Sequence, residues 1–377
     1  MTEETKRTYP SWLKGEFKSE QKEYTEPTRL LADDGTLLSP GWARHMVFDY
    51  DRTKSKPSMR KKEWDFYQIS NGKYMVQISF ANISIGGYVS AALVNLREPD
   101  KNKKYGAGTV VAPMTLFLGG KDKYVLPPKG DVPNNVKFTI NAIGKSEFEF
   151  DTKENSRTLY YKSTADGKEV ECNFHMDIPE GLENITTVLP FKNHPTRYFM
   201  TTKQNCMPCS GTFRWGDEVV EFSKEDTFCA LDWGRVNTPH QLVWYWGNGS
   251  AYVNDDNGNR HLFGFEITWG IGDESKATET CIFYDGKAHK FGAVDVEVFP
   301  KPDKFSEAWH FVSEDGRFDF TMKPFYDHHS DTNVLNMLRM HTHQVHGLWT
   351  GTAILDDGTE IKVKDMYAFC EYVENKW

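Results

Sequence analysis

Apolar and polar residues alternate in short runs along most of this chain. Tyr74, Val76, Ile78 and Phe80 fall on one face of such a run, with Gln77 on the other, which is the period of two of a half-buried β-strand. Comparable strand-length runs, rich in β-branched or aromatic residues and separated by turns, cover 88–95, 109–118, 136–142, 147–152, 158–163, 170–176, 184–189, 213–222, 242–252, 262–269, 280–284, 309–312, 317–322, 348–355 and 360–363. The pattern predicts a mainly β chain.

Two dipeptides predict tight hairpins between these runs. Asp285-Gly286 and Asp357-Gly358 each separate two strand-like segments, and Asp-Gly suits the two-residue turns that connect antiparallel strands. Helices do not alternate regularly with the strands, which disfavours a doubly wound α/β fold. We therefore expect antiparallel sheets.

Two stretches show helical spacing instead. Apolar residues recur every three or four positions in 331–340 and in 365–376, where Met366, Phe369 and Val373 carry the pattern. We expect these stretches to form short helices that cap or plug the β structure.

The length of 377 residues exceeds the size at which one hydrophobic core usually stops growing. Similar numbers of predicted strands lie on either side of residue 190, and the segment Phe191-Lys-Asn-His-Pro interrupts the pattern there. The first 25 residues are charged and show no sustained period. We expect an N-terminal arm over 1–25 and two β domains, over 26–190 and 191–377.

Composition supports the β assignment and narrows the partners. Aromatic residues make up 14% of the chain, and β-rich folds accommodate such side chains well. A formal net charge of -9 argues against broad affinity for nucleic acid. The N-terminus has no apolar leader and no run reaches membrane-spanning length, so we expect a cytoplasmic protein without a membrane span.

The segment 203–248 has the densest set of polar residues among aromatic ones, as a ligand pocket requires. Asp232 and Arg235 lie three residues apart and could form a charge-assisted pair, with Asp232 as a general acid or base. The alternative is a structural ion pair. His240 is a second candidate, because an imidazole side chain is the usual group for proton transfer near neutrality, or it is a structural histidine.

Aromatic residues of one predicted strand offer walls for a ligand. Trp244 and Trp246 must share a face, with Tyr245 on the other, so one set is expected to face a cavity. Such stripes also serve as ordinary core.

Two groupings of cysteine and histidine residues have spacings that could suit a metal ion. Cys206-Met-Pro-Cys209 has no second pair to complete a zinc site, and the six scattered cysteines are expected to be free thiols. His341, His343 and His346 are the best metal-like cluster, with His328 and His329 as neighbours. A strand places His346 on the opposite face from the other two, and no carboxylate partner is evident. No metal site is assigned, and no cofactor is expected.

The motifs of hydrolases with a nucleophile elbow, of P-loop NTPases and of dinucleotide-binding proteins are missing from the sequence. Other motifs in order along 26–377 identify the chain as a member of domain-of-unknown-function family 2804. They are Glu26-Pro-Thr-Arg-Leu-Leu, Gly41-Trp-Ala-Arg44, Lys62-Glu-Trp-Asp-Phe-Tyr67, Lys203-Gln-Asn-Cys-Met-Pro208, Leu231-Asp-Trp-Gly-Arg235, Ala277-Thr-Glu279, Gln344-Val-His-Gly347 and Glu371-Tyr-Val-Glu-Asn-Lys-Trp377. The chain departs from the family at Val236 and His346, where glycine and phenylalanine are usual, and the second departure argues against a fixed role for His346.

This family is distantly similar to the two-lipocalin-domain group that contains carotenoid 1,2-hydratase, the AttH-like proteins, and fungal hydratase and Diels–Alderase relatives. The resemblance implies two lipocalin-like antiparallel β-barrel halves and a cavity for polyene, fatty-acid or terpenoid-like molecules. Our leading hypothesis is a cofactor-independent hydratase, dehydratase or double-bond isomerase. The expected catalytic residues are Asp232, Arg235, His240, Glu279 and Asn205. The expected ligand-binding residues are Gln204, Trp233, Trp244, Tyr245, Trp246, Asn248, Trp269, His343 and Gln344.

Two other function classes stay open. A lipocalin-type carrier would use the same cavity to store or deliver a lipid, with a purely structural Asp232. A carbohydrate-active β enzyme would need two carboxylates at a defined separation, which the sequence does not locate. The oligomeric state is open, with a homodimer as a hypothesis.

Overall fold

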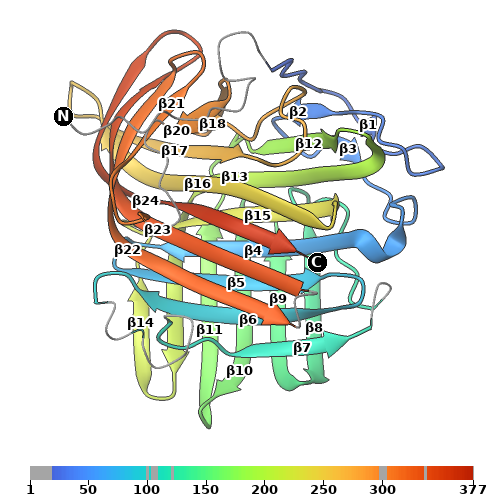
Figure 1. Ribbon diagram of the computed structural model, residues 1–377. Helices are drawn as coiled ribbons and strands as arrows, with labels where there is room; N and C mark the ends of the chain where they lie inside the picture. Colours follow the sequence, from blue (N-terminus) through green and yellow to red (C-terminus); the bar gives the residue numbers. More distant parts are fainter. Residues whose placement is uncertain are drawn as a thin grey trace.

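The computed structural model describes residues 19–98, 102, 109–119, 123–296, 304–334 and 338–376. Two large antiparallel sheets contain most of them (Figure 1). Helical structure is minimal in the part of the chain that the model describes, where η2 (Ser58–Arg60) is a single 3-10 turn. Among the described residues, no helix has the length and apolar character needed to cross a bilayer.

The first sheet closes on itself. Its main strands are β4 (Lys61–Ser70), β5 (Tyr74–Asn82), β6 (Gly86–Asn95), β7 (Met114–Leu118), β8 (Asn134–Ala142), β9 (Gly144–Thr152), β10 (Ser156–Ala165), β11 (Lys168–Asp177), β13 (His194–Trp215) and β15 (Phe228–Asn237). They pair in the order β7-β6-β5-β4-β15-β13-β11-β10-β9-β8. Leu116 on β7 and Ile143 at the β8–β9 turn exchange backbone hydrogen bonds of 3.0 and 3.1 Å, which joins the two ends.

Short strands extend this sheet at one side. β12 (Ile185–Phe191) pairs with β13 and with β2 (Gly41–Ala43), and β14 (Glu218–Phe222) also pairs with β13. A separate two-stranded sheet joins β1 (Thr28–Arg29) to β3 (Phe48–Asp49).

The second sheet is a curved near-barrel. Its strands are β16 (Gln241–Asn254), β17 (Arg260–Trp269), β18 (Cys281–Tyr284), β19 (Lys287–Lys290), β20 (Val294–Val296), β21 (Trp309–Ser313), β22 (Phe318–Val334), β23 (Leu338–Ile354) and β24 (Glu360–Lys376). They pair in the order β19-β18-β17-β16-β24-β23-β22-β21-β20. The long strands β22, β23 and β24 run across the strands of the first sheet (Figure 1).

Each sheet encloses its own hydrophobic core. Tyr67, Phe148 and Trp233 belong to the core of the first sheet, and Trp309 and Trp349 to that of the second. The prediction of a mainly β chain with two antiparallel halves is thus confirmed.

Both Asp-Gly hairpins are confirmed as well. Asp285 and Gly286 connect β18 to β19 with φ angles of 45° and 82°. Such left-handed backbone at both central residues matches the twist of the strands on either side. Gly358, with φ of 88°, lies in the turn between β23 and β24.

The two predicted helices are wrong. Residues 331–334 end β22, 338–340 begin β23, and 365–376 lie in β24, while 335–337 lie outside the described residues. On β24, Met366 and Cys370 pack into the core of the second sheet, while Phe369 faces the other way, against Trp246. A strand that is buried on both faces has apolar residues at both odd and even positions, and some of these then fall three or four residues apart as in a helix.

The boundary expected near residue 190 stays a prediction about folding units. The hydrogen-bonded sheets themselves change later, because β13 and β15 belong to the first sheet and the chain enters the second at Gln241. The segment Leu231–Arg235 therefore lies in the first sheet.

Part of the predicted arm, 1–18, lies outside the described residues. The remaining part packs on the body, since the Glu20 amide donates to the Ser275 carbonyl and the Trp42 amide to the Lys22 carbonyl.

Candidate functional site

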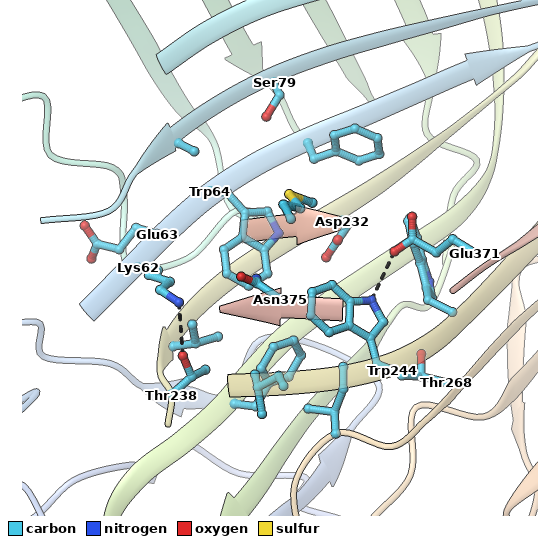
Figure 2. A pocket seen from close by; sticks show the side chains of 18 of the residues that line it. Lys62, Glu63, Trp64, Ser79, Asp232, Thr238, Trp244, Thr268, Glu371 and Asn375 are labelled. Atoms are coloured by element: carbon cyan, nitrogen blue, oxygen red, sulfur yellow. Dashed lines mark hydrogen bonds between the residues drawn. The ribbon is translucent and has the colours of Figure 1, made fainter. Parts of the chain in front are cut away.

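A cavity of about 230 Å³ lies between the outer faces of the two sheets (Figure 2). Side chains on β4, β5, β13 and β15 form one wall, and side chains on β16, β17, β23 and β24 form the other. Most of the wall is apolar, with Trp64, Phe66, Phe199, Trp244 and Trp246 as its aromatic members. The interiors of both sheets are filled by core residues, so the site lies where the two halves meet.

A buried ion pair occupies the wall formed by the first sheet. Lys203 on β13 and Asp232 on β15 are register partners, and Lys203 Nζ lies 2.9 Å from Asp232 Oδ1. The ammonium also lies 4.3 Å from the centre of the Trp246 ring. Burial disfavours the charged amine, but attraction to Asp232, Glu279 and Glu266 outweighs it and raises the pKa of Lys203.

Glu266 on β17 connects this ion pair to the second sheet. It is fully buried, with Oε1 lying 4.0 Å from Lys203 Nζ. Trp246 Nε1 donates a hydrogen bond to Oε1, and Asn205 Nδ2 donates to Oε2 at 3.2 Å. Burial raises the pKa of Glu266 well above its ordinary value, and Lys203 counteracts part of that rise.

Glu279 also lines the cavity. Both of its carboxylate oxygens are buried without a well-aligned hydrogen-bond donor among the described residues. Burial raises the pKa of Glu279, while Lys203 and the neighbouring Thr268 hydroxyl lower it. A buried acceptor of this kind can take a hydrogen bond from a bound molecule.

Glu371 on β24 is a carboxyl poised to exchange a proton. Trp244 Nε1 donates to its Oε1 at 3.0 Å (Figure 2), and Gln344 Nε2 donates to its Oε2 at 3.0 Å. Burial raises the pKa of Glu371 to about 7 against these two hydrogen bonds. A carboxyl with this pKa can donate or accept a proton near neutral pH.

Lys62 on β4 also has a pKa shifted toward neutrality. Burial, together with the positive charges of Arg60 and Arg197, lowers the pKa of Lys62 to about 6. Its Nζ lies 3.3 Å from Thr238 Oγ1. In Figure 2, Lys62 and Glu371 appear at opposite sides of the view, with Trp64 and Asp232 between them.

Five of the residues proposed from the sequence lie on the cavity wall. They are Asp232, Glu279, Trp244, Trp246 and Gln344. Asn205 does not line the cavity but holds Glu266 in place and donates to the Phe265 carbonyl at 2.8 Å.

The predicted pairing of Asp232 with Arg235 is wrong. Residues three apart on a strand point to opposite faces, so Arg235 lies inside the first sheet, 4.0 Å from the ring of Trp233. Arg235 Nη1 donates to Asp65 Oδ1 at 3.0 Å. The cation beside Asp232 is Lys203 and not Arg235.

The other proposed residues lie elsewhere. His240 is exposed beside Arg60, and Gln204 accepts a hydrogen bond from Arg157 within the first sheet. Tyr245 stacks on Trp269 in the core of the second sheet, with ring centres 4.5 Å apart. Asn248 lines a separate, smaller hollow, and His343 lies on the inner face of the second sheet.

Sequence reasoning missed Lys62, Lys203, Glu266 and Glu371 as site residues. Three of them stand inside or at the start of the family motifs quoted above. One feature of the sequence could have identified them. It is a single charged residue on the same face of a strand as apolar residues that line the cavity, as Lys203 is with Phe199 on β13.

The cysteines are free thiols, as expected, and all six are buried. Burial raises the pKa of Cys206 to about 12, so its thiolate is scarce at neutral pH. The Cys206–Cys209 pair therefore lacks the reactive thiolate of a redox motif.

Two solved structures are similar over most of this chain. Kievitone hydratase from Nectria haematococca shares 11% identity, with 96% of this chain and 98% of that chain covered and a TM-score of 0.47. A putative AttH from Nitrosomonas europaea shares 12% identity, with 84% and 92% covered and a TM-score of 0.39. No curated protein matches the sequence.

The motifs at Lys62, Lys203, Leu231 and Glu371 thus belong to strands that meet at one cavity. They lie within a longer match, because residues 21–377 fit the family described as Domain of unknown function (DUF2804). The chain is therefore a member of the DUF2804 family.

Proposed function

We propose that this protein is a cofactor-independent enzyme that adds a proton to, or removes one beside, a carbon–carbon double bond of a hydrophobic small molecule. Hydration, dehydration and double-bond isomerisation share this step. The observation that carries the proposal is Glu371, a carboxyl with a pKa of about 7 on the wall of an aromatic cavity.

Glu371 is the proposed general acid. Trp244 and Gln344 hold its two oxygens from the side of the second sheet, which restricts the direction in which its proton can point. Protonation of an alkene leaves a carbocation, and the faces of Trp64 and Trp244 would stabilise that charge through their π systems. The same rings exclude water from the reacting carbon.

Asp232 is the proposed base. It takes the proton from the attacking water in hydration, or from the adjacent carbon in dehydration and isomerisation. In dehydration Glu371 protonates the hydroxyl group, which leaves as water when the carbon–oxygen bond breaks. Its carboxylate is fixed by Lys203 at 2.9 Å. Glu279, whose buried oxygens lack a well-aligned protein donor among the described residues, is suited to accept a hydrogen bond from that water or from a substrate hydroxyl.

The polar groups favour an enzyme over a carrier. Burying ionisable groups costs several kcal/mol unless they are well compensated, and a carrier of apolar ligands gains nothing from the carboxyls of Glu279 and Glu371 on the cavity wall. The mainly aromatic wall likewise favours an apolar molecule over a sugar.

The test follows isotope incorporation. The protein is incubated in D₂O or H₂¹⁸O with a panel of terpenoid alkenes, unsaturated fatty acids and their hydrated forms, and products are examined by mass spectrometry. Molecules that co-purify, identified by native mass spectrometry, extend the panel. We expect incorporation into at least one member, and Glu371→Gln is expected to slow it by about 100-fold or more, because a positioned general acid contributes 10²–10⁴-fold.

Glu374→Gln is the matched control, since Glu374 lies on the same strand but bonds to Tyr372 on the other face. It should keep wild-type incorporation. Full incorporation by Glu371→Gln would remove Glu371 from the mechanism. Tight binding of panel members without any isotope exchange would establish a carrier instead.

A further inference from the structure

Three histidines converge on the inner face of the second sheet. His329 on β22 is the register partner of His343 on β23, and His341 precedes His343 by two residues on the same face. Each of the three can offer one ring nitrogen, and these nitrogens lie within 4.8 Å of one another. Two neighbouring strands, visible in Figure 1, thereby supply three imidazoles to one point.

The spacing of the nitrogens suits a metal ion. His343 Nε2 lies 3.2 Å from His341 Nε2, and His329 offers a third ring nitrogen in a set whose members lie within 4.8 Å of one another. Zinc–nitrogen bonds of about 2.0–2.1 Å in a tetrahedral site place neighbouring ligand nitrogens about 3.3 Å apart. His341 Nε2 and His343 Nε2 already have this separation, and the His329 ring must turn toward them to complete the site.

Neighbouring side chains orient the rings. Asp327 Oδ2 lies 2.7 Å from His343 Nδ1, which leaves His343 Nε2 directed at the cluster. The Phe305 ring stacks on His343 with centres 3.9 Å apart, and Asp331 Oδ2 lies 3.7 Å from His341 Nδ1. A carboxylate on the distal nitrogen of a histidine is a common support for a metal ligand.

This cluster is separate from the cavity described above. His341 and His343 alternate along β23 with Gln344, which lines the cavity, so they point to the opposite face. His346 and His328 take the cavity-side parity and bond to Tyr367 and Gln344, respectively. They therefore do not belong to the cluster.

We propose that His329, His341 and His343 bind one divalent transition-metal ion such as Zn²⁺, with the fourth coordination position left for water or an exogenous ligand. Three imidazoles without a thiolate favour zinc, copper or nickel over magnesium or calcium, which prefer oxygen ligands. His329 is exposed, which gives the ion a path from solvent. The sequence pattern grouped His341 and His343 with His346, whereas strand pairing replaces His346 with His329.

The experiment measures metal binding by the full chain. Protein stripped with a chelator is titrated with Zn²⁺ in a calorimeter at neutral pH, and Co²⁺ is used as a spectroscopic probe. We expect one high-affinity equivalent and the visible absorption of tetrahedral Co²⁺. His341→Ala and His343→Ala should each lower the affinity by more than about 100-fold, and Asp327→Asn by about 10–100-fold.

His310→Gln is the matched control, because His310 is a partly exposed histidine paired with Asp319 on the same sheet. It should bind Zn²⁺ as the wild type does. Far-UV circular dichroism confirms folding, and His341→Gln replaces His341→Ala if the latter does not fold. The proposal is overturned if the wild type binds no Zn²⁺, or if folded His341 and His343 variants bind it unchanged. Glu371→Gln should retain Zn²⁺ binding. The test of the metal site is therefore independent of the test of the proposed alkene chemistry.

Discussion

Lys203 is the cation beside a group of three acids at the cavity. Its ammonium contacts Asp232 directly and lies 4.0 Å from Glu266, and its charge also lowers the pKa of Glu279. These side chains come from β13, β15, β17 and the segment before β18. The stability of both cavity walls therefore depends on the interactions of the Lys203 ammonium with these carboxylates.

Replacing Lys203 with methionine should therefore destabilise the protein strongly. The change keeps much of the side-chain volume but leaves Asp232 buried without its partner, which typically costs about 3–5 kcal/mol. Urea unfolding measures this loss. Lys276→Met is the control, since Lys276 forms an exposed pair with Glu20 and its removal should cost less than about 1 kcal/mol. An equally small loss for Lys203→Met would contradict the role assigned to the ion pair.

At the scale of elements, the pairing of β15 with β4 shapes the cavity. Gly234 is the register partner of Trp64, and a Cβ at Gly234 would overlap the Trp64 indole. Trp64 lies beside Phe199, with ring centres 6.0 Å apart. A strand position without a side chain thus lets a tryptophan lie flat against the sheet and form the wall of the cavity.

Gly234→Ala should displace the Trp64 ring and destabilise the protein by about 1–3 kcal/mol, as overpacking of a filled site does. Thermal unfolding and tryptophan fluorescence measure the two effects. In a Trp64→Phe background the smaller ring relieves the overlap, so the same change should cost less, and the difference is the coupling energy of a double-mutant cycle. Equal costs in both backgrounds would show that Gly234 acts through the backbone and not through Trp64.

At the scale of the whole molecule, the two halves share one site. The long strands β23 and β24 place Gln344 and Glu371 over the first sheet, and Gln77 Nε2 donates to Gln344 Oε1 at 2.9 Å across the interface. The amide of Cys206 on β13 donates to Ser250 Oγ on β16 at 3.0 Å. Unfolding of either half would therefore expose Glu371 to water.

Global stability should accordingly depend on the protonation of Glu371. Its pKa is about 7 in the folded protein and about 4.5 when exposed, so between these values the folded state binds more protons than the unfolded state. The free energy of unfolding of the wild type, relative to Glu371→Gln, should fall by about 3 kcal/mol as pH rises from 4.5 to 7. Urea unfolding of both proteins across this range measures the difference. A difference independent of pH would show that Glu371 titrates normally.

The sequence by itself determined the antiparallel β architecture, the Asp285-Gly286 hairpin and five cavity residues, including Asp232 and Trp244. These features depend on local signals, namely the period of two, turn chemistry and polar residues embedded among aromatic ones.

Only the tertiary structure decided which groups meet. Strand pairing placed Lys203 beside Asp232, directed Arg235 into the first sheet and brought His329 to His343. The packing of two sheets also buried both faces of β24 and so produced the false helical pattern. A sequence records the order and parity of side chains, whereas burial, pKa and the partner across a strand depend on residues far away along the chain.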